Sequence, residues 1–283
     1  MDEEQTPDIV RRMLERNLRT KHGGIAADPI VPVQLRTEAF CRQSSDHVLT
    51  CARQRTWARS ARVDIKRFRE EMASFPALAE AGDRQLAVLN WLTRLSHASG
   101  CASPILVGCG AVELLTDAQT ATGDVDIITP DIKKLGAQLL ELGFQRSADQ
   151  RFWFHPGHSL LFEFPAETLH PWERTITIEY DSAACLVISP EDLIVDRLET
   201  FEASGGGVDL LYAYLLYHAL NDHLDHQRLL ANVTLLDVRE SFRFIRRLHE
   251  EAIAEGLSVD RQGSKITEEC RRRKGTPWPT GLS

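Results

Sequence analysis

The chain has 283 residues, 43% of them apolar and 26% charged, which is the composition of an ordinary soluble globular protein with a sizeable core. No apolar stretch approaches the length of a membrane span and the acidic first residues do not resemble a secretory signal, so we expect a cytoplasmic protein without membrane contact. The six cysteines form no CxxC pair, which argues against a zinc knuckle, and the net charge of −8 argues against broad binding of nucleic acid.

Residues 1–60 are predicted to form a basic, partly ordered extension. One helix is indicated near its start, where Thr6 would cap the helix and Pro7 would take the first helical position. Residues 1–70 contain 14 Lys and Arg against 10 Asp and Glu, a balance of +4, while the rest of the chain has 19 against 31, a balance of −12. A solvated, flexible segment is the preferred interpretation of this basic part, and local RNA binding is the alternative.

The segment 61–204 is predicted to form the core of the fold. Helices are indicated at 63–72 and 83–99, and the second has a broad apolar stripe that would pack under the first strand of a sheet. That strand, at 105–107, leads into a turn with two glycines and a helix expected to begin at Ala111. Such a turn presents backbone N–H groups at a helix N-terminus, an arrangement that suits phosphate.

A polar loop separates this helix from a second strand, which carries Asp124 and Asp126. Side chains alternate between the faces of a strand, so the two carboxylates point the same way. They repel each other unless a positive charge lies between them, and Mg²⁺ or Mn²⁺, which prefer oxygen ligands, would supply it. The alternative is a charged solvent face of an edge strand, but aspartate is disfavoured in strands. We therefore expect a divalent metal here.

More strands follow in the next part of the chain. A helix opened by Pro130 and ended by Gly143 precedes strands predicted at 152–154, 158–164 and 175–180. Helices come before and after these strands, so the pattern predicts an α/β (α+β) fold in which helices flank a mixed sheet.

Glu163 is the candidate for a third carboxylate at the metal. It lies on an apolar strand between phenylalanines, where an unpaired charge would be costly. The rival is Glu179, but Thr175, Thr177 and Glu179 form one polar face of their strand, so exposure to solvent explains that carboxylate.

Ser189 and Pro190 form a capping-box start for a helix that is expected to end near Ala203. Arg197 falls inside the apolar arc of this helix, so either it pairs with an acid in the core or it is a cation that reaches a bound triphosphate. Asp209, on a largely apolar following helix, needs a partner in either case.

The segment 205–256 is predicted to be helical, and 257–283, which contains glycines and prolines, is predicted to be a flexible tail. A second group contains residues of the types that bind metals. We prefer to interpret it as a polar helix end followed by a linker. Its members are His218, Asp222, His223, Asp225 and His226.

Together these motifs resemble the nucleotidyltransferase superfamily with the polymerase-β-like fold. Within it, they are most similar to small bacterial and archaeal enzymes related to the abortive-infection and toxin-type (toxin–antitoxin) nucleotidyltransferases. The matching pieces are the glycine turn, the Thr-x-Asp-x-Asp strand, the later carboxylate strand and the Ser-Pro-Glu-Asp-Leu helix, at 108–111, 122–126, 160–165 and 189–193. The usual serine of the turn is Ala111 here, so no hydroxyl would help to hold phosphate.

The resemblance implies a metal-dependent enzyme that transfers a nucleoside monophosphate from a nucleoside triphosphate to an acceptor hydroxyl. The acceptor would be a tRNA end, another protein or a small molecule such as an aminoglycoside. Mg²⁺ or Mn²⁺ would be held by Asp124, Asp126 and Glu163, and Glu163 could instead act as the base. The nucleotide would contact Gly108, Gly110, Ala111, Thr122, Arg197 and Asp209, and Asp209 would orient the Arg197 cation.

Two other kinds of protein remain open. A catalytically silent module of the same fold would bind triphosphate with metal but would not turn it over. A nucleic-acid-binding protein that works through residues 1–60 would show salt-sensitive RNA binding, and this binding would vanish when the segment is removed.

Overall fold

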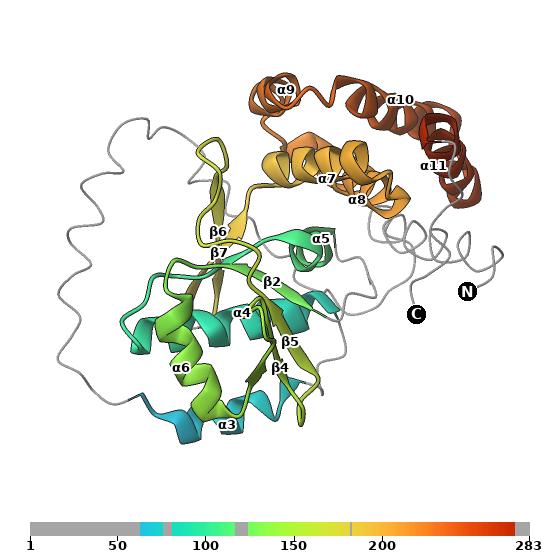
Figure 1. Cartoon of the computed structure of the whole chain (residues 1–283). Coiled ribbons are helices and arrows are strands. Elements are labelled where there is room, and N and C mark those ends of the chain that lie inside the picture. The colour runs from blue at the N-terminus through green and yellow to red at the C-terminus, as the bar shows by residue number, and fades with distance from the viewer. Residues whose placement is uncertain (1–62, 76–80, 117–123, 182, 275–283) are drawn as a thin grey trace.

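Helices flank one seven-stranded mixed sheet, so the expected α/β (α+β) class is confirmed (Figure 1). The computed structural model describes four stretches of the chain, which are 63–75, 81–116, 124–181 and 183–274. The extension predicted at 1–60 and the candidate residue Thr122 lie outside the described residues.

The strands follow the order β3-β4-β5-β2-β1-β7-β6 across the sheet. β2 is parallel to β5 and β1 is parallel to β7, whereas the other neighbouring pairs are antiparallel. The strands are β1 (Ile105–Leu106), β2 (Val125–Ile128), β3 (Gln145–Arg146), β4 (Phe152–His155), β5 (Leu160–Glu163), β6 (Thr175–Tyr180) and β7 (Ala183–Ile188).

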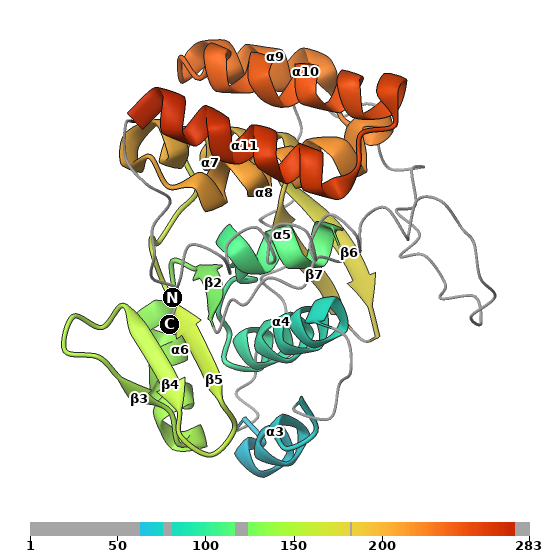
Figure 2. The ribbon, with the colours of Figure 1, turned by 90° about the vertical axis from the view of Figure 1, so that its right-hand side faces the viewer.

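The helices from α7 onward gather in a layer of their own, and α5 lies between this layer and α4 (Figures 1 and 2). The helices of the first part of the chain are α3 (Ile65–Met72), α4 (Ala81–Ala98), α5 (Gly108–Thr116) and α6 (Ile132–Leu142). The helical layer contains α7 (Pro190–Ser204), α8 (Gly207–Leu220), the 3-10 turn η4 (Asn221–His223), α9 (His226–Leu235), α10 (Arg239–Glu255) and α11 (Val259–Lys274).

Trp91 of α4 forms the centre of the core beneath β5. It is fully buried, its indole N–H donates to the Phe68 carbonyl oxygen at 3.0 Å, and its ring stacks on Phe162 with the planes 8° apart. Because neighbouring side chains on a strand face opposite ways, burying Phe162 against Trp91 turns Glu163 toward the other face of the sheet. The apolar core thus fixes the orientation of a candidate site residue.

Two predicted boundaries are wrong. The helix expected to begin at Ala111 begins at Gly108, so the glycine turn is its first turn. The flexible tail expected from residue 257 contains a helix, α11, up to Lys274, with Ile266 and Cys270 buried against the rest of the helical layer. Its apolar stripe is narrow, and it also forms ion pairs with the helical layer, such as Arg273–Glu202, so periodicity alone did not reveal it.

Candidate functional site

The three predicted metal ligands meet on two adjacent strands. Asp124 directly precedes β2, Asp126 lies within β2, and Glu163 ends β5, directly opposite Asp126 in the parallel register. One carboxylate oxygen from each lies within 4.8 Å of the other two, and no other such group of His, Cys, Asp or Glu occurs among the described residues. Oxygens on one Mg²⁺, bound at about 2.1 Å, lie up to about 4.2 Å apart, so small side-chain rotations would enclose an ion.

Burial and the neighbouring negative charges both raise the pKa of Asp126. Burial raises the pKa of this carboxyl from 3.8 to about 7, with the charges of Asp124 and Glu163 adding to the shift. The Cys109 N–H and the Arg197 cation act in the opposite direction. The carboxylate is therefore poorly compensated by the protein alone, as expected for a group that awaits a cation.

Gly108 lets the start of α5 close over Asp126. Its φ is +59°, and a Cβ on this residue would lie 2.0 Å from Oδ2 of Asp126. The backbone N–H of Cys109 donates to the same oxygen at 3.1 Å, and the N–H of Val107 donates to the Asp126 carbonyl at 3.0 Å. The glycine turn was predicted to bind phosphate through its backbone N–H groups. In the structure, the N–H of Cys109 in this turn binds the Asp126 carboxylate.

Gly110 and Ala111 are buried in the first turn of α5. A Cβ on Gly110 would lie 3.2 Å from the Leu106 side chain, and the Ala111 N–H donates to the Val107 carbonyl at 3.2 Å. Ala111 has no exposed surface, so a hydroxyl at this position would itself face the core. Both residues shape the turn rather than present a surface to a ligand.

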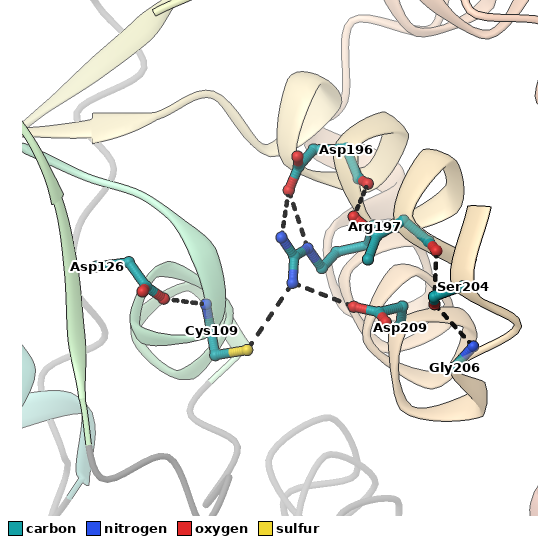
Figure 3. A network of polar contacts seen from close by, with 8 residues as sticks. Cys109, Asp126, Asp196, Arg197, Ser204, Gly206 and Asp209 are labelled. Carbon is teal, nitrogen blue, oxygen red and sulfur yellow. Dashed lines mark hydrogen bonds and ion pairs between the residues drawn. The ribbon is translucent and has the colours of Figure 1, made fainter. Parts of the chain in front are cut away.

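Arg197 on α7 lies in a network that connects the helical layer to α5 (Figure 3). Its guanidinium donates to Asp196 at 2.6 and 2.9 Å and to Asp209 at 3.1 Å, and its Nη1 lies 3.9 Å from the sulfur of Cys109. Burial opposes the charge of Arg197, yet Asp196 and Asp209 hold its pKa above the ordinary value. The predicted pairing of Arg197 with Asp209 is confirmed as a contact.

Cys109 contacts both Asp126 of the carboxylate group and Arg197 of the helical layer. Its N–H binds Asp126 while its sulfur faces Arg197, so a single residue separates the cation from the carboxylates (Figure 3). Burial raises the pKa of the Cys109 thiol to about 12, so it stays protonated and is no nucleophile at neutral pH.

Sequence analysis missed Arg151 and Asp196. Arg151 precedes β4, and its guanidinium forms an ion pair with Glu163 in which Nε donates to Oε1 at 2.5 Å. The signal was the hairpin: β4 pairs with β5 so that Phe152 lies opposite Glu163, which brings the adjacent Arg151 within reach. Asp196 is the sequence neighbour of Arg197, and the apolar pattern of α7 carries no signal for its contact with the guanidinium.

The remaining candidates do not join the site. Glu179 is exposed on β6, as predicted. In the second group of metal-ligand types, between His218 and His226, Asp225 caps α9 and the His226 ring bonds to the Asn221 carbonyl, which matches a polar helix end. Within the described stretches, that group forms no cluster of metal ligands.

Comparison with protein-family models, with curated proteins and with solved structures gives no match to this chain. Among the described residues, no helix combines the length and the apolar character needed to cross a bilayer.

Proposed function

We propose that this protein is a metal-dependent nucleotidyltransferase that moves a nucleoside monophosphate from a nucleoside triphosphate to an acceptor hydroxyl. The observation that carries the proposal is the meeting of Asp124, Asp126 and Glu163, with ligand oxygens within 4.8 Å of one another. Carboxylates this close need a compensating cation. Mg²⁺ or Mn²⁺, held by these three side chains, would bring triphosphate oxygens to the site and offset their charge.

In the proposed reaction, the acceptor oxygen forms a bond to the α-phosphorus while the bond from that phosphorus to the bridging oxygen breaks. Pyrophosphate leaves with the electron pair, and the proton of the acceptor hydroxyl passes to a carboxylate, for which Glu163 at the end of β5 is the candidate. Asp196 and Asp209 hold the Arg197 guanidinium in one place beside Cys109. Arg197 would then stabilise charge that develops on the triphosphate, by position and electrostatics.

Transfer of label from α-labelled triphosphates tests this proposal. With Mg²⁺ or Mn²⁺, the wild-type protein is expected to label tRNA, a protein or itself. The Asp124→Asn/Asp126→Asn variant is expected to lose at least a hundredfold in rate, because the metal ligands are gone. Glu179→Gln, which removes an exposed carboxylate on β6, is the matched control and should transfer label like wild type.

A wild-type protein that binds triphosphate with metal, yet transfers no label to any acceptor, would contradict the enzymatic proposal. It would point to a nucleotide-binding module that does no chemistry. The alanine at position 111 has little bearing on this outcome, since its side chain is fully buried.

A further inference from the structure

A cleft of about 580 Å³ opens between α6 and the β3–β4 hairpin, and it reaches the end of β5 at the residues that follow Glu163. Its charged lining consists of the cations Lys133, Arg146 and Arg151 and the acids Asp149 and Glu167. The side of the cleft next to β5 is formed by the residues that directly follow Glu163, beginning with Phe164 and Pro165. A ligand in this cleft would therefore lie against the backbone that carries the third carboxylate.

Two of the three cations in the cleft form no ion pair with another described residue. No ion pair involves Lys133 or Arg146 within the described part of the chain, and Arg146 only donates to the Gln150 side chain at 3.1 Å. Asp149 accepts hydrogen bonds from the Ser147 hydroxyl and the Arg151 backbone N–H, which hold its side chain beside the turn, and Glu167 is the other acid of the lining. The two unpaired cations are thus available to an anionic ligand.

Arg151 joins the cleft to the metal site. It lines the cleft while its guanidinium is paired with Glu163, and its exposed fraction is 52%. A cation held by Asp124, Asp126 and Glu163 would compete with Arg151 for the Glu163 carboxylate and would weaken this pairing. The guanidinium, which is shaped for two-pronged binding of phosphate, would then turn its donors toward a group in the cleft.

We propose that this cleft binds a phosphate ester of the acceptor, with Lys133 and Arg146 as the primary contacts and Arg151 as the link to Glu163. That the bound group belongs to the acceptor rests on the proposed transferase function. The binding of phosphate in this cleft does not rest on it. Phosphate esters occur both in free nucleotides and in an RNA strand. The exposed apolar surface of Leu140 and Pro165 in the same cleft suits a nucleotide, with phosphate on one side and a sugar or base on the other.

Binding measured without metal or triphosphate tests the cleft independently of catalysis. The full-length protein is titrated in EDTA against a fluorescent single-stranded RNA trinucleotide, with fluorescence anisotropy as the readout. Lys133→Ala/Arg146→Ala is expected to weaken binding about tenfold or more, because charge-assisted contacts to phosphate are lost. The slope of log K against the logarithm of the salt concentration should fall in magnitude by about one. Both side chains are exposed, so circular dichroism should show an unchanged fold.

Arg243→Ala/Arg246→Ala is the matched control, since it removes the same charge from exposed positions on α10, in the helical layer. It should bind the trinucleotide within about twofold of wild type, as expected for screened distant charges. Competition by unlabelled AMP then separates the two sources of the phosphate. Displacement by AMP at concentrations similar to those of the trinucleotide indicates a free nucleotide, and weak displacement indicates an RNA strand.

Equal weakening in the cleft variant and the α10 control would overturn the proposal, because binding would then follow net charge alone. A wild-type protein that binds neither AMP nor the trinucleotide, or that binds only a polycation such as kanamycin, would also overturn it. Phosphate-ester binding in EDTA that depends on Lys133 and Arg146, in a protein that transfers no label, would uphold the cleft while the transferase function fails.

Discussion

Gly108→Ala is expected to destabilise the protein by about 2–5 kcal/mol. A positive φ costs a residue with a Cβ about 1–2 kcal/mol, and overpacking adds about 1–3 kcal/mol. Here the new Cβ would lie 2.0 Å from Oδ2 of Asp126, so the carboxylate must swing away or α5 must move. Either movement breaks the Cys109–Asp126 hydrogen bond and removes a candidate metal ligand from its position.

Gly256→Ala separates the two causes. Gly256 ends α10 with φ of +62°, nearly that of Gly108, and a Cβ there would meet nothing within 4 Å. The control should therefore lose only about 1 kcal/mol and should leave metal binding unchanged. Urea unfolding gives the free energies. Similar losses in the two variants would show that the backbone conformation, and not the closeness of Asp126, makes Gly108 necessary.

The metal-free protein is expected to lose stability as the pH rises from about 4 to about 7. The pKa of Asp126 is raised from 3.8 to about 7 in the folded protein, so between these values the folded state holds a proton that the unfolded state has released. The loss is of the order of 2–4 kcal/mol, since one unit of pKa corresponds to about 1.4 kcal/mol and solvent screens part of the effect.

Asp126→Asn should remove this loss of stability. The amide has the shape of the carboxyl group and no charge to desolvate, so the metal-free variant should be more stable than wild type near pH 8 and similar to it near pH 4. Saturating Mg²⁺ should stabilise wild type near pH 8 and leave the variant unchanged. Thermal unfolding at both pH values, with and without Mg²⁺, measures these differences. An identical pH dependence in the two proteins would contradict the assigned electrostatics.

The three carboxylates of the site could be predicted from the sequence because the pattern around each one is local. They are Asp124, Asp126 and Glu163. Strand alternation fixed the faces of the aspartates, and the buried phenylalanines next to Glu163 fixed its face. That the two strands are neighbours was not implied by these patterns, and the parallel register of Asp126 with Glu163 is a tertiary fact. The fold class followed from the order of helices and strands.

Arg151 and α11 could not be predicted in the same way. The contact of Arg151 with Glu163 depends on the register of the β4–β5 hairpin, which one residue of slippage would change. Helix α11 is mostly polar, and contacts such as Arg273 with Glu202 exist only once the helical layer has assembled. Arg197 shows the intermediate case, since its burial and its partner Asp209 were expected but Asp196 was not.

The most direct test of the account is the number of Mn²⁺ ions bound per chain, measured from the loss of the free Mn²⁺ signal in electron paramagnetic resonance. Wild type and Glu179→Gln are expected to bind at least one ion per chain near neutral pH, and Asp124→Asn/Asp126→Asn is expected to bind none at the same concentrations. The difference follows from the three carboxylates that meet at β2 and β5. Equal binding by all three proteins, or none by wild type, would contradict a metal centre at this site.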